Sequence, residues 1–287
     1  MTSPTPRVKE AGLAGRWYPA AADALAAAMR ALLEAAGPPL PGVVAVLAPH
    51  AAYAHSGGVA ASAHAAAGGG HRRAIVLAPS HHVTFRGAAA LAVAAYRTPL
   101  GALPVDEAAV AALAATELVR TNPAVFQREH AIEMQLPLLQ TVDPGCALVP
   151  LLIGKLEPGD AEALAAALRP MLDADTLVVV SSDLVHYGRG FDYLPVPPAS
   201  AEAVRAGMRR IDEGAIERIL VADAEGFARY IEASGATICG HAAIEIMLRA
   251  LPGVRGEQLA YSSSIDATGD FEDRVVSYAA VAFRTAA

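Results

Sequence analysis

Apolar residues recur along this chain with two alternating patterns. Alanine-rich segments repeat their apolar positions every three to four residues, which predicts amphipathic helices. These segments are 21–36, 106–117, 160–172, 199–212, 223–233 and 241–251. Short runs of branched apolar residues lie between them and predict strands at 43–48, 74–78, 89–93, 148–153, 177–180, 259–263 and 275–283. The alternation predicts one α/β domain over residues 1–287, with a largely parallel or mixed central sheet flanked by helices.

The composition of the chain indicates which kinds of molecule it is expected to bind. The 287 residues are 54% hydrophobic and 18% charged, with a net charge of -7, so the chain can bury a large core. No run of Lys or Arg occurs, which argues against a nucleic acid or an anionic membrane and favours a small molecule or a protein. No apolar stretch approaches the roughly 20 residues that span a bilayer, and residues 1–7 lack the apolar core of a signal peptide. We therefore expect a cytoplasmic protein.

Several predicted strands end in side chains that bind metals or protons. His50, the adjacent His81 and His82, and the pair Asp183 and His186 each follow a different apolar run. The carboxyl ends of parallel strands gather along one edge of a sheet, where α/β proteins place their ligands. The sequence therefore predicts a metal or acid/base site at that edge. Because the side chains of adjacent residues diverge, only one of His81 and His82 is expected to face it.

Two polar pairs have a spacing of three residues. Asp183 and His186 would project to the same side if the strand before them turned into a helical turn. A carboxylate beside an imidazole fixes its tautomer and raises its basicity; a capping Asp and a surface His are the alternative. His130 and Glu133 have the same spacing on a predicted short helix that ends at Pro137. A solvated helix face is the alternative there.

The two cysteines differ in their surroundings. Two are too few for a disulfide framework, so both are expected to be thiols. Cys239 lies between two predicted helices, and a thiol near a helix amino terminus is shifted toward the thiolate that binds metals. Cys146 precedes an apolar strand and has no polar neighbour, so it is better explained as a small core residue.

His50 begins a loop of small residues that leads into a helix. The alternative to a metal ligand at this position is a histidine that caps the helix or is buried for structural reasons.

Eight ordered segments resemble the Memo (mediator of cell motility) family, whose bacterial and archaeal members are called AmmeMemoRadiSam system protein B. They are 14–19, 48–51, 79–82, 96–100, 129–134, 181–183, 237–240 and 276–280. The resemblance covers nearly the whole chain and implies a fold similar to class III extradiol dioxygenases, whose iron is held by two histidines and a carboxylate. In Memo-like proteins the corresponding cleft looks like a two-histidine, one-cysteine site that takes copper or iron.

Carried over position by position, the resemblance places the metal ligands on His50, His81 and Cys239. It places the catalytic positions on Asp183, His186, His130 and Glu133. Ala52 stands where the family usually has Gly, His55 is an added polar residue, and His241 stands where the human-type protein has Arg. Preference for a substrate or partner is therefore the feature that transfers least.

Two functions of different class follow from the resemblance. The first is a dioxygenase-like oxidoreductase that depends on non-haem iron or copper, with zinc also suited to the donors, and acts on a small molecule. Because Cys239 replaces the dioxygenase carboxylate with an oxidisable donor, ring cleavage is not implied. The alternative is a non-catalytic protein that sequesters copper or iron, or binds a peptide or protein, on an inherited scaffold. The family also implies a radical SAM enzyme and an AMMECR-type protein as partners. The oligomeric state is not predicted.

Overall fold

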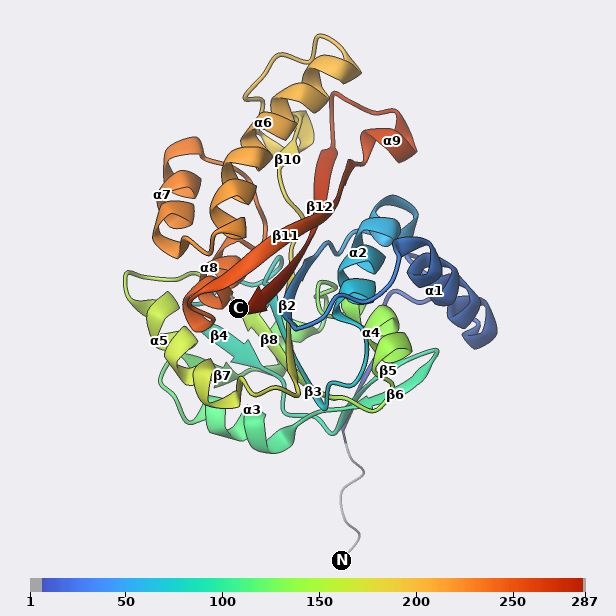
Figure 1. Cartoon of the computed structure of the whole chain (residues 1–287), viewed down its shortest axis with the longest axis vertical. Helices are drawn as coiled ribbons and strands as arrows, with labels where there is room; N and C mark the ends of the chain where they lie inside the picture. Colours follow the sequence, from blue (N-terminus) through green and yellow to red (C-terminus); the bar gives the residue numbers. More distant parts are fainter. Residues whose placement is uncertain (1–6, 286–287) are drawn as a thin grey trace, which may run out of the picture.

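A long mixed sheet forms the centre of the computed structural model, which describes residues 7–285 (Figure 1). Within these residues the sheet has nine strands: eight follow the order β10-β12-β2-β9-β3-β8-β4-β7, and β11 pairs with β12. The strands are β2 (Val43–Ala48), β3 (Arg73–Pro79), β4 (Ala88–Ala90), β7 (Val119–Thr121), β8 (Ala147–Ile153), β9 (Thr176–Ser181), β10 (His186–Tyr187), β11 (Val254–Ser263) and β12 (Val275–Thr285). A second sheet combines β1 (Val8–Glu10), β5 (Ala95–Thr98) and β6 (Gly101–Pro104).

Helices cover both faces of the central sheet. They are α1 (Ala22–Ala36), α2 (Tyr53–Ala67), α3 (Glu107–Ala114), α4 (Leu136–Val142), α5 (Asp160–Leu168), α6 (Ala201–Leu220), α7 (Ala224–Ser234), α8 (His241–Ala250) and α9 (Ile265–Thr268), with 3-10 turns at Pro123–Phe126, Glu133–Gln135, Arg169–Met171 and Arg189–Phe191. Helix α2 packs against β2 and β12, whereas α8 packs against β9 and β3. Figure 1 shows α1, α2 and α4 on one side of the sheet and α5, α7 and α8 on the other. The predicted α/β architecture is confirmed.

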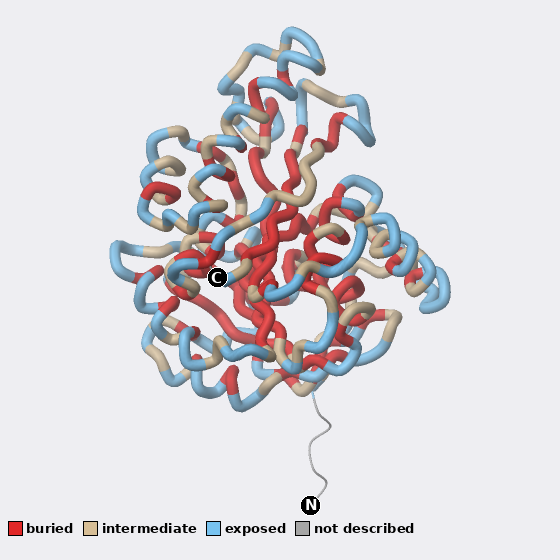
Figure 2. The backbone as a smooth tube through the Cα atoms, viewed as in Figure 1, coloured by how far each residue is buried: buried red, intermediate tan, exposed pale blue. Residues whose placement is uncertain are grey.

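The inner strands are continuous apolar runs because both of their faces are covered. In β2, β3, β8 and β9 nearly every residue is buried, and Figure 2 shows this burial as a band through the middle of the molecule. Helix α2 is also largely buried and consists mostly of Ala, Gly and Ser, so its backbone can lie close to the sheet. Among the described residues no helix is both long enough and apolar enough to cross a membrane; the cytoplasmic location stays a prediction.

The order of the parallel strands decides which loops meet. Strand β9 lies between β2 and β3, with Ala48 opposite Ser181 and Leu77 opposite Val180. All three strands run in the same direction, so the residues that follow them emerge at one edge of the sheet. The chain passes from β2 to β3 around the position that β9 later fills, which is the kind of strand-order switch where α/β proteins bind ligands. The prediction that these strand ends gather is therefore confirmed.

The structure corrects two local predictions near this edge. Residues 183–185 are irregular instead of a helical turn, and His186 pairs with Val276 in β10. Pro137 lies in the first turn of α4 and begins that helix instead of ending one. A proline suits this position because the first helical turn leaves its N–H groups without intrahelical partners. His130 therefore precedes the helical residues and is not on the same helix face as Glu133.

Candidate metal centre

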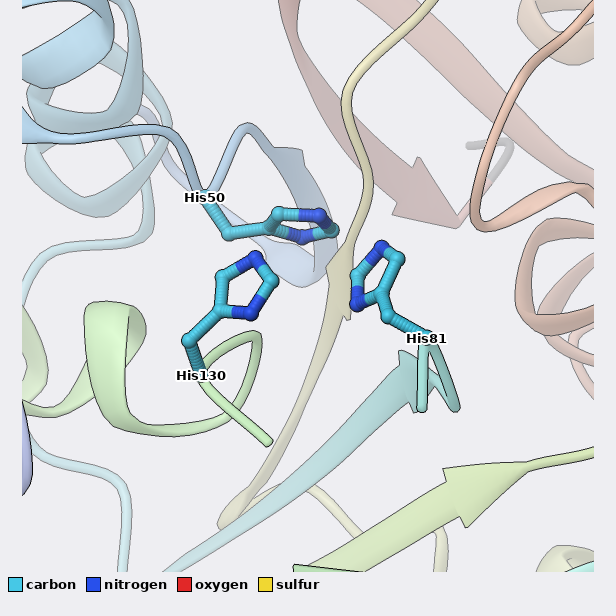
Figure 3. A group of neighbouring side chains, drawn as sticks. All are labelled: His50, His81 and His130. Atoms are coloured by element: carbon cyan, nitrogen blue, oxygen red, sulfur yellow. The ribbon is translucent and has the colours of Figure 1, made fainter. Parts of the chain in front are cut away.

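Three imidazoles meet at the carboxyl edge of the sheet. Ring nitrogens of His50, His81 and His130 lie within 4.8 Å of one another. Figure 3 shows the rings facing a common space. His50 lies on the loop after β2, His81 on the loop after β3, and His130 just before the 3-10 turn Glu133–Gln135 that leads into α4. Imidazole nitrogens bind zinc at about 2 Å, so nitrogens at this separation can share one ion after small side-chain movements.

His50 is held from behind by β9 and the loop that follows it. The side chain is 1% exposed, and its Nδ1 lies 2.9 Å from Ser181 Oγ. Its backbone N–H donates to Asp183 Oδ1 at 2.8 Å. Burial, followed by the nearby His81 and His130, lowers the pKa of His50 well below its ordinary value. The imidazole is therefore neutral near pH 7, which is the form that binds a metal.

Glu129 fixes the second imidazole. Its carboxylate accepts the backbone N–H of His81 at 2.7 Å, and its other oxygen lies 2.9 Å from His81 Nδ1. That second oxygen also accepts the N–H groups of His130 and Ala131. Burial alone would raise the pKa of Glu129, but the hydrogen bonds and charge of His81 outweigh it and lower the pKa to about 2. The ionised carboxylate holds a hydrogen on His81 Nδ1 and leaves Nε2 free, as in many metal sites.

Cys239 adds a sulfur donor beside the imidazoles. Its Sγ lies 3.4 Å from His50 Nε2 and accepts the backbone N–H of Asp183 at 3.3 Å. The next residue, Gly240, lies so close to Ser182 that a Cβ at position 240 would approach the Ser182 Cβ to 2.5 Å. A larger residue at position 240 would therefore displace the loop that carries the thiol.

The protonation expected of Cys239 from its place before α8 is wrong for the metal-free chain. Burial and then the charge of Asp183 raise the pKa of the thiol, against weaker opposing hydrogen bonds from Ser182 and two backbone N–H groups. The thiol therefore keeps its proton at neutral pH. A bound cation reverses this balance, because a coordinating thiol is deprotonated by the ion's charge.

Asp183 and His186 both border the centre, but no hydrogen bond joins these two described residues. Asp183 is 5% exposed, and burial raises its pKa although His186 and backbone N–H groups oppose the shift. His186 Nδ1 lies 3.0 Å from the Leu184 carbonyl and 3.1 Å from the Thr237 carbonyl. Because carbonyl groups only accept, Nδ1 carries the hydrogen and Nε2 is available as a proton acceptor.

Glu133 is directed to a different part of the molecule. Its carboxylate accepts the backbone N–H groups of Gly12 and Leu13, both at 2.8 Å, and the hydroxyl of Tyr18 at 2.6 Å. These bonds hold residues 12–18 against the core. Trp17, in this N-terminal segment, packs edge-on against the ring of His130 at 4.8 Å between centroids. Glu133 therefore supports the centre through this segment, and its side chain lines the same hollow as His130.

Two hollows in the surface border the candidate donors, one at Cys239 and the other at His130. One, of about 510 Å³, includes Cys239, His241 and Lys155 in its lining. The other, of about 410 Å³, includes His130 and His82. Both volumes fall in the range of small-molecule sites, roughly 300–1,000 Å³.

Comparison with known proteins places the chain in a family. The family model described as "Memo-like protein" matches residues 9–282. The chain belongs to the Memo-like family. It is 31% identical to Protein MEMO1 of Xenopus laevis and 30% identical to Protein MEMO1 of Homo sapiens, each over 285 residues, which are 95% of this chain and 96% of the relative. A MEMO1 family protein of Caldivirga maquilingensis is 29% identical over 249 residues, covering 84% and 83%. A solved structure of an uncharacterized protein from Escherichia coli K12 has a TM-score of 0.46 and 15% identity, covering 74% of this chain and 86% of that one.

In this Memo-like chain the structure brings most of the predicted residues together. His50 and His81 meet as expected, but the third donor within 4.8 Å of both is His130, which was expected as a catalytic position. Cys239 lies beside His50 alone in this arrangement, 3.4 Å from its Nε2. Burial, followed by His81, lowers the pKa of His130 to about 4, so it too is neutral near pH 7. The structure adds Glu129, which lies in the predicted polar segment but to which the sequence assigned no role. Its only sequence signal is its place directly before His130 in segment 129–134.

Proposed function

We propose that this protein binds one transition-metal ion through His50, His81 and Cys239, with His130 as a further donor. The observation that carries the proposal is the convergence of the His50, His81 and His130 ring nitrogens to within 4.8 Å. The rear nitrogens of His50 and His81 are already engaged by Ser181 and Glu129, so the front nitrogens are free. Imidazole and thiolate together suit iron, copper and zinc.

We further propose that the ion is iron or copper and that the protein is a redox enzyme acting on a small molecule. When bound, such an ion would supply one-electron chemistry and Lewis acidity. The two hollows beside the donors give a small molecule access to the centre. His186 presents a free Nε2 for a proton, and Asp183, whose pKa is raised by burial, can hold one close to His50. A radical SAM enzyme and an AMMECR-type protein stay predicted partners.

Sequestration of the metal without turnover is the second candidate, and Cys239 favours it. A half-buried thiol that keeps its proton in the metal-free chain releases it when a soft cation binds, and thiolate is a soft donor that selects copper(I) and zinc. Such a donor is also open to oxidation during repeated turnover. The metal retained after purification and the rate of oxygen consumption separate the two functions.

The test begins with metal-free protein. It is loaded separately with Fe²⁺, Cu⁺ or Zn²⁺, and the bound metal is counted after desalting. We expect one ion per chain in the wild type and almost none in His50→Ala or His81→Ala, with Cys239→Ser reduced. Oxygen uptake with catechols and other small reductants would support the enzyme, whereas full loading without uptake supports sequestration. Equal loading of the wild type and the His50→Ala, His81→Ala double variant contradicts both.

A further inference from the structure

A buried chain of hydrogen bonds extends from the rear of His50 into the core. It passes through Ser181 and Gln135 to His64 on α2, and all four side chains are at most 1% exposed. Successive distances are 2.9 Å from His50 Nδ1 to Ser181 Oγ, 2.9 Å from Ser181 Oγ to Gln135 Nε2, and 2.9 Å from Gln135 Oε1 to His64 Nε2. Polar groups this deeply buried are costly without partners. The direction of each bond can therefore be worked out from which atoms donate and which only accept.

The amide of Gln135 has only one consistent orientation. One end lies 3.0 Å from the carbonyl oxygen of Pro49, which can only accept a hydrogen bond, so that end is the NH₂ group. Its two hydrogens go to Pro49 and to Ser181. The oxygen end faces His64 Nε2, which must therefore carry a hydrogen and donate. His64 thus orients the amide from the side away from His50.

The hydrogen-bond partners of Ser181 determine which ring nitrogen of His50 carries the hydrogen. Ser181 has one hydroxyl hydrogen, and the carbonyl oxygen of Ala131 accepts it at 2.7 Å. Because that hydrogen is taken by Ala131 and Gln135 donates to one lone pair of the same oxygen, the hydroxyl cannot also donate toward His50 and has one lone pair left for it. His50 must then donate to Ser181, which places its ring hydrogen on Nδ1. The opposite tautomer would bring two lone pairs together in a buried position.

We propose that Ser181 and Gln135 are positioning residues that hold His50 in its Nδ1–H tautomer and so present Nε2, without a hydrogen, to the metal centre. The purpose of this arrangement rests on the proposed function, but the tautomer is a property of the metal-free protein. His50 Nε2 lies 3.4 Å from Cys239 Sγ, so the lone pair is directed to the side where the other donors lie. Neither Ser181 nor Gln135 needs to touch the ion.

The direct test is the tautomer of His50 in metal-free protein with ¹⁵N-labelled histidine. Long-range proton–nitrogen spectra distinguish a ring nitrogen that carries hydrogen from one that does not, and a His50→Asn variant identifies the signals. We expect Nδ1–H in the wild type and a mixture of tautomers in Ser181→Ala. Gln135→Met should give a smaller change in the same direction, because the Ser181 oxygen then loses the donor that helps to fix its orientation while the Ala131 carbonyl still accepts its hydrogen. Zinc affinity, measured by competition with a coloured chelator, should fall roughly 10-fold or more in Ser181→Ala.

Ser56→Ala is the matched control. Ser56 is also 1% exposed, and its hydroxyl donates to the Ala51 carbonyl instead of joining the chain to His50. This variant should leave both the tautomer and zinc affinity unchanged, and Ser181→Thr, which keeps the hydroxyl, should restore Nδ1–H.

Two results would overturn the proposal: an Nε2–H tautomer in the wild type, or an unchanged Nδ1–H tautomer in the variants that fold. If Ser181→Ala loses its near-ultraviolet circular dichroism, Gln135→Met and the wild-type tautomer decide the question. A wild type that binds no zinc, iron or copper removes the proposed function, yet the tautomers still test the positioning.

Discussion

Glu129 and Glu133 lie four residues apart in one short segment and are almost equally buried, at 7% and 6% exposed, but they serve different regions. Glu129 accepts hydrogen bonds from His81 and from the backbone that carries His130. Glu133 accepts its hydrogen bonds from residues 12–18. Burial and motif do not distinguish the two carboxylates; their donors do. One carboxylate orients a candidate metal ligand, and the other fastens the N-terminal segment.

The largest effect is expected from Glu133→Ala. The change leaves the buried Tyr18 hydroxyl and two half-buried backbone N–H groups without their acceptor, and a buried donor left unpaired costs about 1–3 kcal/mol, a half-buried one less because water can reach it. We expect the free energy of unfolding to fall by about 3 kcal/mol, and protease cleavage near residues 12–18 to become faster. Urea unfolding and limited proteolysis measure the two effects. A loss below about 0.5 kcal/mol would show that the N-terminal segment does not depend on Glu133.

The next largest effect is expected in metal affinity, which should differ between Glu129→Gln and Glu133→Gln. The first replaces the ionised partner of His81 Nδ1 with a neutral amide, and the loss of such a partner typically costs about 10–100-fold in affinity. The second leaves the contacts of the three imidazoles intact, so its affinity should stay within about threefold of the wild type. Zinc competition on metal-free protein measures both. Equal losses in the two variants would remove the distinction between the two carboxylates.

The smallest effect concerns a third buried carboxyl, Asp212, which is 0% exposed. Burial raises its pKa to about 6 although Tyr261 and the Val185 N–H bind its oxygens. The folded chain therefore holds this proton more tightly than the unfolded chain. Asp212 lowers stability progressively as pH rises from about 4 to about 6, and its cost is complete above that range.

Asp212→Asn removes this titration. The free energy of unfolding of the wild type, measured relative to Asp212→Asn, should fall by about 1 kcal/mol between pH 5 and pH 7. Urea unfolding of both proteins at the two pH values gives the comparison, and only the pH-dependent part is attributed to the charge. Parallel curves would mean that Asp212 titrates alike in the folded and unfolded chains, unlike Glu129, whose pKa is lowered.

Local pattern was enough to predict the inner strands and two of the donors. The run 43–48 coincides with β2, and His50 and His81 follow directly from where β2 and β3 end. Helix α2 has no amphipathic period that could have marked its bounds, because ten of its fifteen residues are buried. Short strands such as β7 were not predicted, because three residues carry too little periodicity.

The remaining parts of the site depend on contacts between distant segments. Glu129 reaches His81 across 48 positions, and no local spacing encodes that contact. The protonation of Cys239 was mispredicted because a helix amino terminus is a local feature, whereas the burial and the Asp183 charge that raise the pKa of the thiol come from tertiary packing.

The insertion of β9 between β2 and β3 also bears on how the protein folds during synthesis. His50 and His81 emerge from the ribosome long before Thr176–Ser181, the strand that lies between their own strands. Until that segment arrives, β2 and β3 lack the neighbour that joins them, and His50 lacks the serine that supports its ring. Closing such a long loop slows folding. A nascent chain that ends before residue 176 should therefore capture metal poorly, which delays loading until the sheet that holds the donors is complete.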